Sequence, residues 1–443
     1  MTETITILST CIVRPSSPTP PQHMFLAAPD FIWRWFHYNQ RILFFKLDKQ
    51  SSSDLFVSRL KSSLSLALLE FFPWAGRCFE QENGRLALDC NDAGVPFIEA
   101  YVDVPFPTLE NDGFRYQPFF KHLAPHGDVT TWTGPDLPLL SVQVTRFPGD
   151  KGLVLGIGHS HIVADGSSLW HFMKSWGECA RGVPLSMHPV HMRQALGPEK
   201  LILPPPYREE ENDKAGPPLP RPGGRKMELV QRNFHFTSEM IRKLKNMATT
   251  SCPADHAPFS SLQALSAHMW KHVIAATDMD ESRESIFFLL ANMRSRVEPP
   301  LPEGYFGNAI MREGSVARKG ELQQESLGAT TLRMQRLVQT LDETLMRTFY
   351  GALEVLPINK VFEGMDFSMV MLQVSSSPRF PVYDVDFGWG PPLSVQCPLI
   401  RGDGEMMWFP GREGGGSIDI GLALTKPAME RLEQDKSLFS FED

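Results

Sequence analysis

The sequence of 443 residues is poor in cysteine, and its six cysteines form no Cys-x-x-Cys pair. A zinc site is therefore not expected, and no other feature of the sequence indicates a metal. Scattered single thiols fit a reducing compartment better than a secreted disulfide framework.

The sequence also lacks an excess of basic residues. Its 43 Lys and Arg against 51 Asp and Glu give a net charge of −8, which argues against nucleic acid as the main partner. A local basic pocket for one phosphorylated cofactor remains open. No apolar run reaches about 18 residues, so no membrane span is expected. No signal peptide or targeting tail is visible either, so the expected location is the cytosol.

What the sequence does contain is the composition of a globular protein, with 42% hydrophobic and 21% charged residues. Its length predicts two domains of roughly 200 residues each. Residues 196–226 form the clearest boundary, because they combine a proline triplet, three consecutive glutamates and a Pro-Gly-Gly run. Such a segment resists burial, so we expect an exposed linker between domains 1–195 and 227–443.

Strands and helices alternate in both halves, which predicts a mixed α/β fold. Helical spacing follows Ser53, with apolar residues at Val57, Leu60, Leu64 and Leu68. The other predicted helices are the one that begins at Ser167, then 238–248, 259–276, most of 320–355 and a last helix capped by Thr425. The predicted strands are 86–90, 153–158, 228–236, 286–291, 369–374 and 417–422.

One short motif stands out as a candidate for chemistry. His161 follows the strand 153–158, and Asp165 and Gly166 come four and five residues later, before a helix. The pattern His-x-x-x-Asp-Gly is expected by chance only about 0.05 times in a chain with 13 histidines. A strand end exposes the imidazole, and the turn lets the aspartate brace it, so the motif suits a general base. His159, two residues earlier, is expected to be a buried or hydrogen-bonded histidine of the strand, with orientation of the loop as the alternative.

Three further segments have unusual local patterns. Asp386-Phe387-Gly388-Trp389-Gly390 predicts a tight turn around a tryptophan. Gly304-Tyr305-Phe306-Gly307-Asn308 follows a proline-rich stretch and reads alone as a loop. Ser260 and Ser261 begin a helix, where hydroxyl and N–H groups suit either N-capping or phosphate binding.

Taken together and in this order, these segments resemble the plant BAHD acyl-CoA-dependent acyltransferase family. The resemblance covers the whole chain and includes Phe71–Arg77 and Asn292–Arg296. Within the family, Ser376–Pro381 and Phe409–Gly414 resemble most the subgroup of cuticle-related acyltransferases and isochorismate-conjugate processing relatives.

The resemblance implies a fold and a reaction. The fold would be two chloramphenicol-acetyltransferase-like domains with an active-site channel at their interface. In that channel His161 would take a proton from a small-molecule hydroxyl or amine, the acceptor, as it attacks the thioester of acyl-CoA. The resemblance further implies a monomer, no permanently bound cofactor and no covalent acyl-enzyme.

The same resemblance assigns roles to individual residues. Asp165 would pair with Arg294 and brace the histidine loop, so its catalytic contribution would be indirect. Asp386 is a candidate second catalytic carboxylate, although we favour a structural role for its loop in the channel wall. Ser260 and Ser261 are candidate contacts for coenzyme A. The residues assigned structural roles are Arg294, Gly166, Gly388, Trp389 and Gly390.

The sequence departs from the family at two positions. Family members that act on shikimate or quinate carry an oxyanion-stabilising tryptophan where this chain has Ser377, and an acceptor-binding arginine near Phe362. Both departures argue against shikimate or quinate as the acceptor.

Three other functions remain open from the sequence. A lyase on the same scaffold is the first, and the intact His161 favours transfer over it. A peptide-condensation domain is the second, but such domains have adjacent histidines where this chain has Ser160. A non-catalytic metabolite-binding relative is the third, and it predicts a damaged position 161, which is not seen. The sequence names neither the acyl group nor the acceptor.

Overall fold

The computed structural model of the protein describes most of the chain. The described residues are 4–47, 53–82, 84–127, 129, 134, 136–204, 228–255, 257–362 and 369–441. Most of the predicted linker 196–226 therefore lies outside the described residues.

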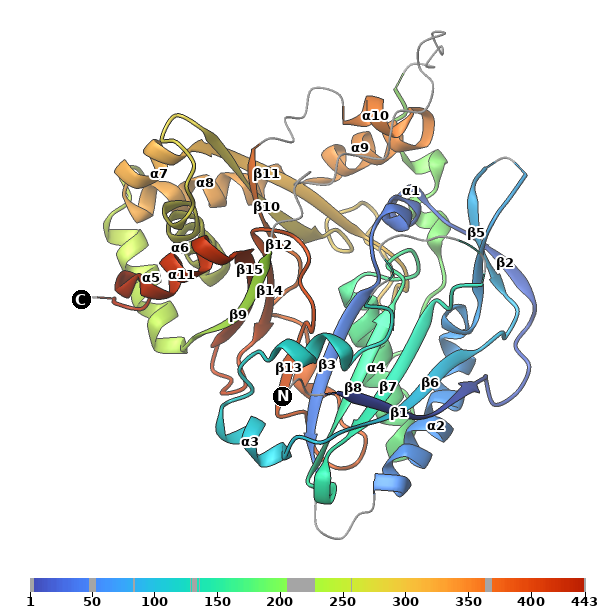
Figure 1. The fold of residues 1–443 in the computed structure, drawn as a ribbon. Helices are drawn as coiled ribbons and strands as arrows, with labels where there is room; N and C mark the ends of the chain where they lie inside the picture. The colour runs from blue at the N-terminus through green and yellow to red at the C-terminus, as the bar shows by residue number, and fades with distance from the viewer. Residues whose placement is uncertain are drawn as a thin grey trace.

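The described residues form two six-stranded mixed sheets and one small sheet (Figure 1). In spatial order, the first sheet contains β1 (Ile5–Val13), β6 (Val95–Val102), β7 (Leu140–Arg146), β8 (Gly152–His159), β3 (Asn39–Lys46) and β13 (Ser394–Gln396). The second contains β11 (Ile310–Arg318), β10 (Glu284–Asn292), β12 (Val370–Val374), β14 (Glu405–Pro410), β15 (Ile418–Thr425) and β9 (Leu229–Phe236). The small antiparallel sheet contains β2 (Gln22–Phe25), β5 (Leu86–Cys90) and β4 (Arg77–Glu80).

Helices cover the two sheets. Those of the first half are α1 (Ala28–Phe31), α2 (Ser53–Glu70), α3 (Phe106–Asn111) and α4 (Gly166–Arg181). Those of the second half are α5 (Ser238–Thr250), α6 (Ser261–Ala276), α7 (Lys319–Gln324), α8 (Leu327–Thr340), α9 (Glu343–Val355), α10 (Ile358–Val361) and α11 (Lys426–Gln434). The mixed α/β fold with two sheet-containing domains is thus confirmed, while the helix expected over most of 320–355 is divided into three.

The core of the first half lies between its sheet and the paired helices α2 and α4. The predicted apolar face of α2 is buried there, with Leu60, Leu64 and Leu68 inaccessible to solvent. Strand β8 is buried along its whole length. Its Gly156 and Gly158 leave room for the backbone of Leu123 and Pro125 to pass close to the sheet.

A strand from the second half of the chain completes the first sheet. Residues of β13 pair antiparallel with β3, with Val395 opposite Leu43. Figure 1 shows this orange strand beside the blue β3. The two halves therefore share a backbone hydrogen-bond ladder as well as side-chain contacts.

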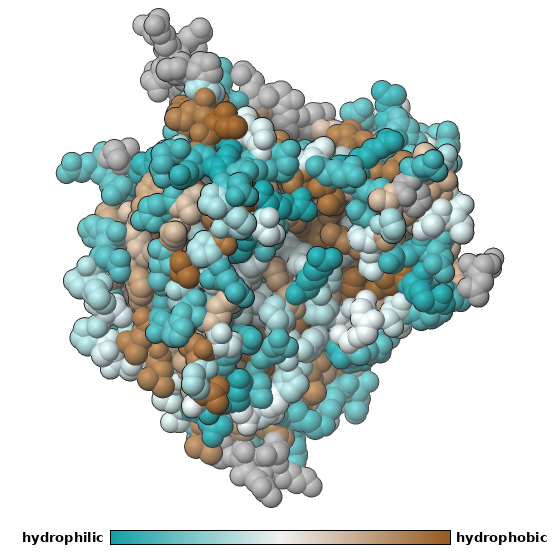
Figure 2. Space-filling model, turned by 180° about the vertical axis from the view of Figure 1, so that it is seen from behind, coloured by the Kyte–Doolittle hydropathy of each residue, from teal (hydrophilic) through white to brown (hydrophobic). Residues whose placement is uncertain are grey.

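The surface seen in Figure 2 is mostly hydrophilic, with hydrophobic residues in separate small groups. Among the described residues, no helix is both long and apolar enough to cross a membrane. All six cysteines are free thiols.

Candidate active site

His161 lies in a short turn between the end of β8 and the start of α4. Backbone bonds shape this turn, because Ser160 N donates to the Leu139 carbonyl at 2.9 Å and Val163 N donates to the Ser160 carbonyl at 3.3 Å. Asn308 arrives from the second half of the chain, and its Nδ2 donates to the His161 carbonyl at 2.9 Å. The turn is therefore held by both halves of the molecule.

The imidazole of His161 is in an environment that disfavours its charged form. Burial lowers its pKa from 6.5 to about 4, although its own backbone carbonyl and the nearby Asp165 act in the opposite direction. The indole of Trp33 stacks on the ring, with 3.9 Å between the ring centroids and 17° between their planes. His161 is thus neutral near pH 7 and able to accept a proton.

Asp165 forms the predicted pair with Arg294. Two guanidinium nitrogens donate to its carboxylate at 2.8 and 2.9 Å. The same carboxylate caps α4 by accepting from Ser168 N at 3.0 Å, and it accepts from Ala309 N at 3.0 Å. Burial alone would raise the pKa of Asp165, but Arg294 and these N–H groups outweigh burial and leave it below its ordinary value. The carboxylate points into this cluster, so it braces the turn.

Gly166 is required by a close approach from the second half of the chain. A side chain at this position would overlap the ring of Phe380, because a Cβ would lie 2.5 Å from a ring atom.

The two positions at which the chain departs from the shikimate- and quinate-acting members have ordinary local contacts. Ser377 lies in the segment that carries Phe380, and its Oγ accepts from Arg379 N at 3.2 Å. Phe362 packs against Phe349, with 6.1 Å between the ring centroids.

A second buried ion pair supports the histidine turn, and no sequence pattern indicated it. Arg193 Nη1 lies 2.6 Å from Asp30 Oδ1, and both side chains are almost completely buried. Arg193 donates to the Val163 carbonyl at 2.5 Å, and Asp30 accepts from Asn308 Nδ2 at 2.9 Å. Asp30 and Arg193 are 163 positions apart, so no short-range pattern connects them. Asn308, which contacts Asp30, was part of the Tyr305–Asn308 element in the sequence, but it did not identify its partners.

His159 is the buried strand histidine that was expected. It is 1% exposed, and its ring meets the edge of Trp74 at 5.5 Å between centroids. Burial holds its pKa well below the ordinary value, and the neighbouring His161 and Arg41 act in the same direction.

The loop that begins at Asp386 lies at the opposite end of α4 from His161. Asp386 Oδ1 accepts from the backbone N–H groups of Gly388, Trp389 and Gly390 at 2.7, 3.1 and 2.9 Å. Arg181, the last residue of α4, donates to the Asp386 carbonyl. The Asp386 backbone also lies against Gly177, and the helix between Asp165 and Gly177 is roughly 18 Å long, at 1.5 Å per residue. This position does not support a catalytic role for Asp386.

The two glycines of that loop have a backbone conformation that side chains rarely adopt. Gly388 has φ 100° and Gly390 has φ 94°. The ring of Trp389 packs edge-on against Phe56 at 4.3 Å between centroids and anchors the loop on α2. These contacts suit the structural roles that were assigned to Gly388, Trp389 and Gly390.

Ser260 caps helix α6, as one of its two interpretations allowed. Its Oγ accepts from Gln263 N at 3.2 Å, while Gln263 Oε1 accepts from Ser260 N at 2.8 Å. This reciprocal arrangement is a capping box. Ser261 is the first residue of the helix and is partly exposed.

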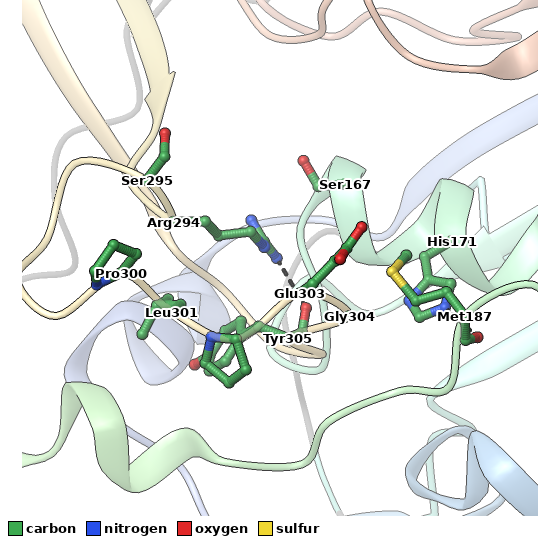
Figure 3. Close-up of a pocket in the computed structure, with 11 residues that line it drawn as sticks. Ser167, His171, Met187, Arg294, Ser295, Pro300, Leu301, Glu303, Gly304 and Tyr305 are labelled. Atoms are coloured by element: carbon green, nitrogen blue, oxygen red, sulfur yellow. Dashed lines mark hydrogen bonds between the residues drawn. The ribbon is translucent and has the colours of Figure 1, made fainter.

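A pocket of about 320 Å³ opens beside Arg294 (Figure 3). Ser167, Arg294 and Tyr305 are among its lining residues, and Arg294 donates to the Tyr305 carbonyl at 3.4 Å. It adjoins the ion pair that braces the histidine turn. In the part of the chain that the structure describes, no three His, Cys, Asp or Glu side chains gather as metal ligands.

Comparisons of the sequence with known proteins agree on one family. A family model described as the Transferase family matches residues 3–439. The BAHD acyltransferase DCR of Arabidopsis thaliana is 32% identical, over 99% of this chain and 93% of that protein. A hydroxycinnamoyltransferase of Narcissus pseudonarcissus is 31% identical, over 97% of this chain and 98% of that protein.

Solved structures share the fold. Vinorine synthase matches with a TM-score of 0.74 at 23% identity, over 99% of both chains. TRI101 of F. graminearum, in complex with coenzyme A and deoxynivalenol, matches with a TM-score of 0.79 at 20% identity, over 94% of this chain and 98% of that one. From its sequence matches over nearly the whole length, the chain belongs to the BAHD acyltransferase family and is an acyltransferase enzyme.

Proposed function

We propose that the protein transfers an acyl group from acyl-CoA to a hydroxyl or amine of a plant specialised metabolite or lipid-like acceptor, with His161 as the general base. The observation that carries this proposal is the neutral imidazole on a turn held by both halves of the molecule. A base must be unprotonated before it acts, and it must be fixed relative to both substrates.

The nitrogen that we assign to proton transfer is Nε2. Nδ1 of His161 is enclosed by protein atoms, so it is out of reach of an acceptor. The backbone bonds of the turn and the stacked Trp33 set the orientation of the ring. The acceptor would therefore approach the Nε2 edge of the imidazole.

The proposed reaction needs one proton and no covalent enzyme intermediate. Nε2 takes the proton of the acceptor hydroxyl while the acceptor oxygen bonds to the thioester carbon, which gives a tetrahedral oxyanion. Collapse of the oxyanion breaks the carbon–sulfur bond, and the imidazolium returns its proton to the departing thiolate of coenzyme A. Positioned base catalysis of this kind contributes about 10²–10⁴ in rate. Holding both substrates together supplies a further part of the acceleration.

Several observations support the assignment of the two substrates. TRI101, which shares the fold, was crystallised with coenzyme A, and relatives include a hydroxycinnamoyltransferase. Acyl-CoA is then a co-substrate and not a permanently bound cofactor, and Ser260 and Ser261 are candidate contacts for it. Family members that act on shikimate or quinate have a tryptophan at the position of Ser377 and an arginine near Phe362. Because this chain lacks both, we propose an acceptor other than shikimate or quinate.

Four further assignments are part of the proposal. Residues 1–195 and 227–443 act as two domains joined by the linker 196–226, with the reaction channel between them. The protein works as a monomer in the cytosol. Its subgroup is that of the cuticle-related and isochorismate-conjugate processing relatives.

A substrate screen tests the proposed function. Wild-type protein and the His161→Ala variant are incubated with a panel of acyl-CoAs and plant alcohols or amines. Release of free thiol and formation of new esters or amides are followed by thiol titration and mass spectrometry. We expect transfer by the wild type and loss of at least about a hundredfold in the variant. Elimination without an acceptor, or equal transfer by both proteins, would contradict the proposal.

A further inference from the structure

Trp33 has a placement that neither the motifs nor the proposed reaction account for. It lies in a 3-10 turn (Ile32–Trp35) directly after α1, and its indole lies flat on the imidazole of His161. The centroid separation of 3.9 Å and the angle of 17° describe a face-to-face stack. Trp33 is therefore the aromatic group in direct contact with the proposed base.

The position of Trp33 is fixed by the same residues that fix His161. Asp30, three residues earlier, accepts from Ala27 N at 3.1 Å and forms the buried pair with Arg193. Asp30 also accepts from Asn308 Nδ2, which holds the His161 carbonyl. One buried carboxylate thus sets the turn that carries the indole and, through Asn308, the turn that carries the imidazole.

The charged groups around His161 leave the imidazolium form weakly supported. Asp165 favours that form, but its carboxylate is already committed to Arg294 and to two backbone N–H groups. Arg41, on β3, opposes it, and the ring of His159, on β8, lies 6.4 Å away as a second imidazole. The group that contacts the ring face directly is the electron-rich face of Trp33.

A cation over the face of tryptophan, within about 6 Å of the ring, is attracted by the negative charge of the π face. The neutral imidazole gains little from that attraction, whereas the imidazolium gains it in full. In the proposed reaction His161 is an imidazolium only after it has begun to take the proton of the acceptor. Such a contact favours the transition state over the ground state, which is the condition for catalysis.

We infer that Trp33 is a positioning residue for His161, whose indole face orients the imidazole and stabilises the imidazolium formed during transfer. This inference rests on the proposed function, because it requires His161 to accept a proton. The turn Ile32–Trp35 would then stabilise the charged form of His161, which no residue of the His-x-x-x-Asp-Gly motif does by contact with the ring face.

Fluorination of the indole tests this inference without changing its shape. Tryptophan analogues with one to four ring fluorines are placed at position 33 by amber suppression, and kcat/KM is measured for the donor and acceptor that the wild type uses. Each fluorine weakens the negative π face, so log kcat/KM should fall steadily, by roughly two- to thirtyfold over the series. The same series at Trp74, whose ring meets His159 and not His161, is the matched control and should stay flat.

Two outcomes of the series would overturn the inference. A flat series at position 33 would mean that the indole only fills space. A rising series would mean that the indole N–H, which fluorine makes more acidic, acts as a hydrogen-bond donor instead. Failure of the proposed function is distinguishable, because the wild type would then show no transfer or His161→Ala would be as active as the wild type.

Two ordinary substitutions provide a second readout. Trp33→Phe keeps an aromatic face and should retain most of the activity, whereas Trp33→Leu keeps only the apolar volume. We expect kcat/KM of the Leu variant to be lower than that of the Phe variant by about tenfold. Equal activity of the two variants, with equal melting temperatures, would overturn the inference.

Discussion

At the residue scale, His161 lies close to the carboxylate of Asp165 and nevertheless has a lowered pKa. A histidine near a carboxylate usually gains a proton more easily, yet burial here dominates and lowers the pKa to about 4. Burial is the largest influence on this pKa, and the Asp165 carboxylate is itself paired with Arg294. The arrangement keeps the base ready at any pH near neutrality.

The first prediction concerns the pH dependence of transfer. Because the base acts in its neutral form and its pKa is lowered, kcat/KM should stay level from about pH 8 to pH 5. It should fall only as the pH approaches the pKa of about 4. Initial rates across this range, with samples returned to pH 7 to confirm recovery of activity, provide the measurement. A fall centred near 6.5 would mean that His161 has an ordinary pKa or that another group is the base.

The second prediction concerns the pair of Asp165 and Arg294. Removing one member leaves a buried charge unpaired, so Asp165→Ala should lower the free energy of unfolding by about 3–5 kcal/mol. Arg294→Ala should also be costly, and the double variant should lose less than the sum of the two. Denaturant unfolding of all three variants measures this coupling.

The control for that prediction is a salt bridge on the surface. Glu239 and Arg242 are paired at 2.6 Å, but both side chains are more than half exposed. Glu239→Ala should therefore lower the free energy of unfolding far less than Asp165→Ala. If Asp165→Ala cost no more than Glu239→Ala, the bracing role of Asp165 would be wrong.

At the element scale, local periodicity was sufficient for the long helices and for six of the strands. It did not identify several others, among them β1, β3, β6, β7, β11 and β14. The apolar face of α2 and the capping residue of α6 follow from spacing and from short-range hydrogen bonds. The stretch 320–355 was read as mostly helical, yet Ser326 and Asp342 each begin a new helix by accepting from the N–H three residues on. Ser and Asp are both common N-cap residues, so these two caps indicate in the sequence where the segment divides.

Long-range contacts were not predictable in the same way. The pair of Asp165 and Arg294 came from the family resemblance, since nothing local connects residues 129 positions apart. The pair of Asp30 and Arg193, the stack of Trp33 on His161 and the short strand β13 were missed altogether. Each depends on how distant segments pack, and β13 has only three residues with which to form a pattern.

The third prediction concerns the loop that begins at Asp386. Asp386→Ala removes the acceptor of three backbone N–H groups, so the free energy of unfolding should fall by about 1–3 kcal/mol. The kcat/KM of the folded protein should remain within a few fold of wild type, because the loop is far from His161. Asp384→Ala, at an exposed carboxylate two residues earlier, should change neither quantity. A loss of activity above a hundredfold without loss of stability would instead make Asp386 catalytic.

At the scale of the whole molecule, the histidine turn and the first sheet both depend on contributions from the two halves. Asn308 and Arg294 reach the turn from the second half, and β13 completes the sheet that carries β8. A site built in this way forms only when both halves are folded and docked. Activity and global stability should therefore be lost together on unfolding.

The fourth prediction tests the strand shared by the two halves. Val395 on β13 is 2% exposed and packs in the core of the first half, so Val395→Asp buries a charge there. We expect the free energy of unfolding to fall by at least about 3 kcal/mol and amide hydrogen exchange in β3 to become faster. Val316→Asp, at an exposed position on the edge strand β11, is the control and should be nearly neutral. Unchanged exchange in β3 would mean that β13 contributes little to the first sheet.

The role of His161 as general base is tested most simply by comparing the wild type with His161→Gln, once a donor and an acceptor are known. The glutamine keeps a polar side chain of similar size but cannot act as a base near neutral pH. We predict that binding of acyl-CoA, measured by calorimetry, changes by less than threefold, while ester or amide formation falls by about 10²–10⁴. Product formation by the variant at the rate of the wild type would contradict the account.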